Sequence, residues 1–88
     1  MYILYNRVNN KMRVSTDKND VGFTKSPYNY RIELDGVHLN NAITADDELS
    51  TVLVYVKDKD GNFLFSEEKY ASLKTEMLYG KVKITKIN

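Results

Sequence analysis

Carboxylates are the side chains of this sequence best suited to chemistry, and one group of them is Asp46-Asp47-Glu48 in the segment ADDELS. Neighbouring carboxylates act as acid and base only where a cleft and an uneven environment separate their pKa values. The sequence indicates neither condition. A solvated loop or a helix N-terminus, whose dipole favours acids, is the simpler interpretation. An acidic patch for a basic partner surface is the remaining alternative.

A second group, Asp58 and Asp60 beside Gly61, resembles part of a calcium-binding loop. Aligning Gly61 with the invariant glycine of such a loop places Val56 at the first position, where a carboxylate ligand is required. Asp-Gly is also a favoured sequence for a tight turn between two strands. We therefore expect an ordinary hairpin turn here, and the sequence indicates no metal site.

Nucleophilic catalysis finds no support in the residue types present. The chain has no cysteine and one histidine, which argues against disulfides, thiolate chemistry and the common zinc sites. His38 stands near no recognisable serine nucleophile, so we assign it no role. We expect no enzyme activity, no catalytic residues and no cofactor.

Length and charge limit the classes of partner. The 88 residues suffice for a single domain, residues 1–88, and the 13 basic and 12 acidic side chains nearly balance. A near-neutral chain is a poor ligand for nucleic acid or for an anionic membrane, although Tyr79 among Lys81, Lys83 and Lys86 could stack on a single strand. No segment approaches the roughly 20 apolar residues of a membrane span, and the N-terminal segment does not resemble a secretory signal. We expect no membrane interaction and regard nucleic acid as an improbable partner.

The strands that must position these residues begin at the N-terminus. Two apolar segments flank Asn9-Asn10, which predicts a hairpin, so residues 1–18 are expected to form an N-terminal hairpin or an arm. Residues Asp17–Pro27 are polar and lack a period, which predicts a loop. Tyr28–Asp35 then alternate apolar and polar side chains, as a half-buried strand does.

The next segments predict turns and further strands. Asp35-Gly36 predicts a turn, and Asn40-Asn41 interrupts the strand pattern that follows, which leaves a bulge or a chain reversal open. Residues Thr51–Phe65 predict a β-hairpin with its turn at Lys59–Asn62. The first strand of this hairpin is apolar on both faces. We expect Val52, Val54 and Val56 in the core, and Leu53 and Tyr55 in a second core layer or under a partner.

Near the C-terminus, residues 67–78 contain good helix formers, and Tyr70, Leu73 and Met77 recur near helical spacing. The sequence favours one short helix there. Gly80 precedes a final strand in which Val82 and Ile84 alternate with lysines. The predicted fold is therefore mainly β: a small antiparallel β sandwich or a partly open barrel with at most one short helix.

Seven tyrosines are many for so short a chain. Tyrosine is favoured at protein interfaces because it supplies a large contact area with few rotatable bonds. The alternative is that tyrosine fills core volume in a domain without tryptophan. Our candidate interface residues are Tyr2, Tyr5, Leu53, Tyr55 and Tyr79.

From about residue 32 onward, the segments LDG, ADDE, VLVYVKDKDGNF and LYGKVKI occur in this order. This order resembles small, mostly uncharacterised tailed-bacteriophage proteins whose genes often lie among the head-forming genes. The resemblance implies a non-enzymatic virion structural or assembly protein, a capsid-associated accessory component that binds a capsid or other virion protein. It implies a location in the virion or the host cytoplasm. The alternative is a small phage-encoded inhibitor that binds a host or defence protein.

Overall fold

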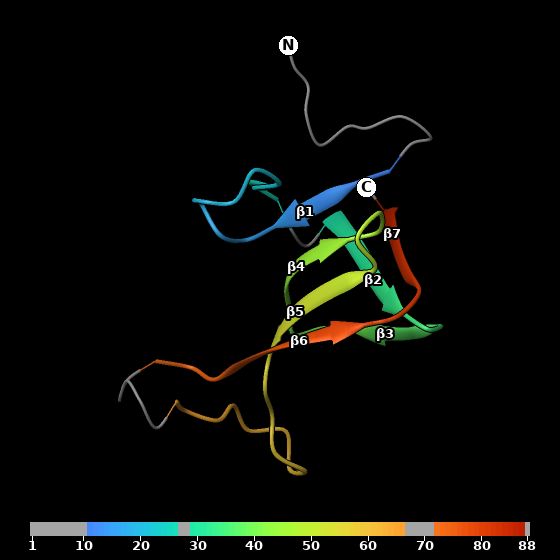
Figure 1. Ribbon diagram of the computed structural model, residues 1–88. Coiled ribbons are helices and arrows are strands. Elements are labelled where there is room, and N and C mark those ends of the chain that lie inside the picture. The colour runs from blue at the N-terminus through green and yellow to red at the C-terminus, as the bar shows by residue number, and fades with distance from the viewer. Residues whose placement is uncertain (1–10, 27–28, 67–71, 88) are drawn as a thin grey trace.

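The computed structural model describes residues 11–26, 29–66 and 72–87, which form seven strands in two antiparallel sheets (Figure 1). The predicted turn at Asn9-Asn10 lies outside the described residues. The first sheet has the order β1-β4-β5-β6 and the second the order β3-β2-β7. The first consists of β1 (Arg13–Ser15), β4 (Ala42–Asp46), β5 (Thr51–Tyr55) and β6 (Thr75–Tyr79). The second consists of β3 (Val37–Leu39), β2 (Tyr30–Leu34) and β7 (Val82–Lys86).

The two sheets pack face to face and share one apolar core. Alternate residues of each strand point inward, so that Val52 and Val54 of β5 are buried while their neighbours are half-buried. The sheets do not close into a barrel, and the described residues contain no helix. The prediction of a mainly β, sandwich-like fold is confirmed. The buried apolar residues are Val14, Ile32, Ala45, Val52, Val54 and Val82.

A two-residue turn at Asp35-Gly36 connects β2 to β3, as the sequence predicts. Asp35 and Gly36 both have positive φ, 52° and 86°, the backbone combination of a two-residue hairpin loop whose twist matches that of the strands. After β3, the Asn40-Asn41 pair carries the chain from one sheet to the other. The register of β4 against β5 shifts between Ala42 and Thr44, so a sheet change and a bulge together explain the interrupted pattern.

The helix favoured over residues 67–78 is absent from the described part of that range. Thr75–Tyr79 form β6 instead, with Leu78 opposite Val52 and Met77 opposite Leu53. The backbone groups along this edge of β5 need partners, and a strand supplies them while placing Leu78 against the core. Pairing with β5 therefore outweighs the helical propensity of this segment, which is weak at Thr75 and Tyr79.

The hairpin predicted after β5 forms only in part. The turn is present: the Gly61 amide donates to the Asp58 carbonyl at 3.0 Å, and Gly61 has φ of 87°. However, β5 pairs along its length with β4 and β6, and the returning segment makes only isolated bridges, such as Lys57 to Phe63. We call residues 56–74 the β5–β6 arm; Figure 1 shows its described parts projecting away from the sheets.

Three backbone hydrogen bonds form a ring at the base of this arm. The Val56 amide donates to the Lys74 carbonyl at 2.9 Å, the Lys74 amide to the Leu64 carbonyl at 2.8 Å, and the Leu64 amide to the Val56 carbonyl at 3.0 Å. Each of the three residues donates one hydrogen bond and accepts another. The backbone groups of three chain segments are therefore paired without a regular β ladder. The ring fixes where β5 ends and β6 begins.

Replacing Gly61 by valine should lower the free energy of unfolding by about 1 kcal/mol or more, because a β-branched residue is strained at positive φ. No atom lies within 4 Å of the position that a Cβ would take, so the cost comes from the backbone and not from a clash. Urea denaturation measures it, with Lys59→Val in the same turn as the control. Equal stability of the wild type and the Gly61→Val chain would contradict the turn geometry.

Replacing Val54 by alanine should cost on the order of 1–3 kcal/mol through lost burial and the cavity left behind. Val54 is 4% exposed at the centre of the core. Val21, which is 64% exposed, is the matched control, and its change to alanine should stay within about 0.5 kcal/mol. Similar losses in the two variants would show that β5 does not pack as described.

Candidate functional site

The outer face of the four-stranded sheet, turned away from the core, is covered over β1 and β4 by the chain itself. The loop after β1 pairs with the free edge of β1, where the Ser15 amide donates to the Gly22 carbonyl at 2.9 Å and the Thr24 amide donates to the Ser15 carbonyl at 2.8 Å. Where the loop leaves β1, the Asp17 amide donates to the Ser15 hydroxyl at 3.0 Å. Beneath this loop, the hydroxyls of Ser15 and Thr44 share a buried hydrogen bond of 2.7 Å. This half of the face is polar and closed.

An ion-pair cluster holds the covering loop in place. The Arg13 guanidinium makes two hydrogen bonds to the Asp20 carboxylate, at 2.8 and 2.6 Å, and one to Asp46 at 3.1 Å. The hydrogen bond from Arg13 is the main reason why the pKa of Asp20 lies below its ordinary value. The same hydrogen bond raises the pKa of Arg13, although burial of the guanidinium acts in the opposite direction.

Asp46 has no exposed surface, which corrects the interpretation of the acidic group Asp46-Asp47-Glu48 as a solvated loop or helix start. Its Oδ1 accepts hydrogen bonds of 2.9 Å from the amides of Glu48 and Leu49, in the turn between β4 and β5. The Asp47 carboxylate accepts the Met12 amide at 2.7 Å. Asp46 and Asp47 therefore fix β1 and a turn in place, and both are engaged in structural contacts.

The other half of the outer face, over β5 and β6, is apolar, and several of its described side chains are exposed. Leu53 lies directly opposite Met77, and Thr51 lies opposite Tyr79. The Tyr79 side chain is 74% exposed and Met77 is 44% exposed, whereas Leu53 and Tyr55 are half-buried. Large apolar groups gathered on one exposed face are typical of a protein-binding surface.

The β5–β6 arm contributes one further aromatic ring to this face. Phe63 meets Tyr55 edge to face, with ring centroids 5.7 Å apart and an angle of 69° between the planes. Lys57 places its ammonium 5.2 Å from the centroid of the Phe63 ring and 3.1 Å from the side-chain oxygen of Asn40. These contacts hold the Tyr55 and Phe63 rings against each other. We call Leu53, Tyr55, Phe63, Met77 and Tyr79 the outer β5–β6 face.

Three of the candidate interface residues thus come together on one face: Leu53 and Tyr55 from β5, and Tyr79 from β6. Tyr2 and Tyr5 lie outside the described residues. Sequence reasoning missed Met77, because its segment was interpreted as a helix, and Phe63, because it was assigned only to a hairpin strand. The apolar alternation of Met77 with Tyr79 was the signal that could have identified the former.

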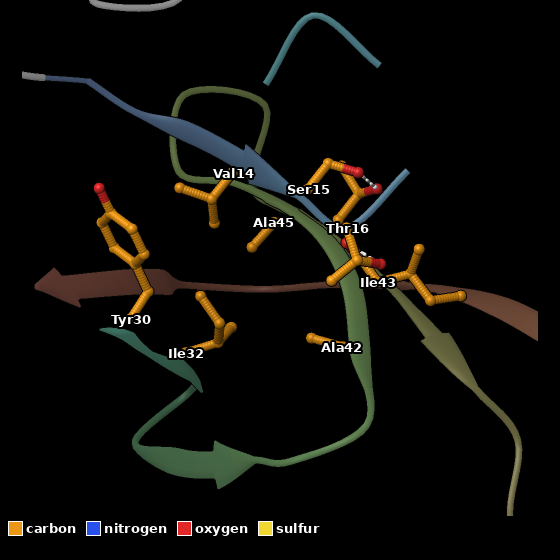
Figure 2. Close-up of a pocket in the computed structure, with 9 residues that line it drawn as sticks. Val14, Ser15, Thr16, Tyr30, Ile32, Ala42, Ile43 and Ala45 are labelled. Carbon is orange, nitrogen blue, oxygen red and sulfur yellow. Dashed lines mark hydrogen bonds between the residues drawn. The ribbon is translucent and has the colours of Figure 1, made fainter. Parts of the chain in front are cut away.

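Between the sheets, a crevice of about 40 Å³ lies where Val14 and Ala45 face Tyr30 and Ile32 (Figure 2). That volume suits one or two water molecules and falls far short of a small-molecule site. A wider groove of about 390 Å³ runs past the exposed His38, with Arg31 also in its lining. Neither space brings together a nucleophile, a base and an oxyanion donor. Within the described ranges, no group of three or more His, Asp and Glu side chains could hold a metal ion.

Asp58, from the group that resembles a calcium loop, serves the turn. Its Oδ1 accepts the amides of Asp60 and Asn62, both at 2.9 Å. The pKa of this exposed carboxylate lies below its ordinary value, chiefly because the Asn62 amide favours the charged form. The side chain thus has a local structural role, of the kind expected for an aspartate in a tight turn.

Comparison with models of protein families, with curated proteins and with solved structures finds no match to this chain. No helix in the described part of the chain is long and apolar enough to cross a membrane. Among the described residues, the outer β5–β6 face is therefore the feature that bears on function.

Replacing Asp20 by asparagine should flatten the acid limb of the stability profile. Because the folded pKa of Asp20 lies below the unfolded value of about 4, its ionised form stabilises the fold above that pH, and this contribution is lost as the pH falls through the folded pKa. We expect the variant to be less stable by about 1 kcal/mol at pH 7 and to converge with the wild type at low pH.

Urea denaturation between pH 7 and pH values below about 3 measures this difference. Asp60→Asn, at an exposed turn position, is the control and should follow the wild type. A constant gap between the Asp20→Asn chain and the wild type at every pH would contradict the role given to the Arg13–Asp20 pair.

Proposed function

We propose that this chain is a non-enzymatic phage virion structural or assembly protein, a capsid-associated component that acts by binding another protein. The observation that carries the proposal is the outer β5–β6 face, an exposed apolar surface built from two paired strands and ordered by aromatic contacts. The order of segments from about residue 32 onward, similar to small phage proteins encoded near head genes, supports the phage context.

The composition of the face suits a binding surface. Tyr55, Tyr79 and Phe63 are aromatic, and Met77 is a flexible apolar side chain, and these types are enriched at the centres of protein interfaces. Charged side chains are fewer at such centres, and none of the five residues of the outer β5–β6 face is charged. A capsid or other virion protein with a complementary apolar surface is the partner we propose.

The charge balance favours a component of a symmetric particle over an inhibitor. With 13 basic and 12 acidic side chains, the chain has no strong net charge of the kind that steers an inhibitor quickly to a single oppositely charged target. A low net charge instead allows many copies to sit close together in a lattice with little mutual repulsion. We propose a location in the virion, or in the host cytoplasm before assembly.

Mass spectrometry of purified virions, compared with the coat protein as an internal standard, tests the proposal. We expect this chain in a fixed stoichiometric amount. In particles assembled with the Tyr79→Ala variant, the amount of the variant relative to the coat protein should be at least about tenfold lower than that of the wild type. Interface aromatics often carry more than 1.4 kcal/mol of binding energy. Tyr55→Ala should behave in the same way.

Val37→Ala is the matched control, because Val37 is 62% exposed and lies on the other sheet. Circular dichroism and thermal melting should show all three variants folded. If the chain is absent from virions and is recovered with a host protein, the inhibitor alternative holds. If the Tyr79→Ala chain is incorporated as fully as the wild type, the outer β5–β6 face is not the binding surface.

A further inference from the structure

The four edge strands of the two sheets differ in how they are protected against pairing with other chains. The edge of β1 is bridged by the loop at Gly22 to Thr24, and β3 is only three residues long. The strand β7 carries Lys83 and Lys86, and lysine on an edge disfavours pairing. In contrast, β6 has five residues, no lysine, no proline and an unshifted register against β5. Of the described edges, β6 has none of these protections.

The hydrogen-bond pattern shows which groups of β6 are free. The Gly80 amide donates to the Ser50 carbonyl, and the Val56 amide donates to the Lys74 carbonyl, at the two ends of the β5–β6 ladder. Because paired residues alternate along an antiparallel ladder, Glu76 and Leu78 are bonded to β5. The amides and carbonyls of Thr75, Met77 and Tyr79 therefore point away from β5, and no described residue pairs with them.

We propose that the β6 edge binds the β6 edge of a second copy of this chain, antiparallel and around a two-fold axis through Met77. Met77 then lies opposite Met77 of the second copy, and Thr75 lies opposite its Tyr79. In this register all the outward amides and carbonyls of β6 find partners. The pairing joins the two four-stranded sheets into one continuous sheet.

A second copy fits this edge because the register is self-complementary. Glu76 faces Leu78 of the other copy, so no like charges lie directly opposite each other, and the net charge of +1 adds little repulsion. Met77, Leu53 and Tyr79 of both copies come to the same side of the joined sheet, because the axis is perpendicular to it. The edge pairing goes beyond the proposed function and does not require it, since it uses backbone groups that the outer β5–β6 face leaves free.

Sedimentation analysis of the full chain tests the pairing, with two charge variants at Met77. Met77 is 44% exposed, so Met77→Lys and Met77→Glu should each fold, as circular dichroism and thermal melting will show. We expect the wild type and Met77→Leu to form dimers. Each charge variant alone should associate at least about tenfold more weakly, because its new charge faces its own copy across the axis.

An equimolar mixture of the Met77→Lys and Met77→Glu chains should recover dimers, since opposite charges then face each other. A monomeric wild type would overturn the proposal, as would dimers of unchanged affinity in both charge variants. Dimers lost in each variant but not recovered in the mixture would exclude the proposed register. Virion incorporation is measured separately, so a monomeric wild type leaves the proposed function standing.

Discussion

Strand β5 is apolar on both faces, and the described residues form one other sheet, which packs against one of these faces. Val52 and Val54 point inward and anchor the core, at 0% and 4% exposure. Packing the three-stranded sheet against this inner face leaves Leu53 and Tyr55 on the outer face. Burial of apolar surface is the main favourable term in folding, and the three-stranded sheet supplies it on the inner side of β5.

The two halves of the outer face therefore differ in the interactions that their side chains make. Over β1 and β4, the buried carboxylate of Asp46 is stabilised by Arg13 and by two backbone amides, and Asp20 ties the covering loop to the same guanidinium. A buried charge is tolerated only when paired and hydrogen-bonded in this way. Over β5 and β6, the exposed side chains are apolar and aromatic, and burial of such groups against another surface is favourable.

Local patterns in the sequence predicted the elements whose causes are local. The alternation around Ile32 and Val54 and the Asp35-Gly36 turn gave the right strands and loop, because periodicity and positive φ are encoded in adjacent residues. The strand state of β6 was missed, since it depends on pairing with β5, whose partner residues lie 20 to 28 positions earlier in the sequence. The burial of Asp46 was also missed, because its partner Arg13 is 33 positions away in the sequence. For the same reason the sequence identified the interface candidates Leu53, Tyr55 and Tyr79 one by one and did not place them on one face.

The described part of the chain leaves the β6 edge of its four-stranded sheet unpaired. Residue-resolved amide hydrogen exchange, at a concentration where the chain is monomeric, tests it most directly. We predict an alternation along β6: the amides of Glu76 and Leu78 exchange slowly because they are bonded to β5, whereas those of Thr75, Met77 and Tyr79 exchange quickly. Uniform slow exchange through Thr75–Tyr79 in the monomer would contradict the account, because it would mean that another part of the chain already occupies this edge.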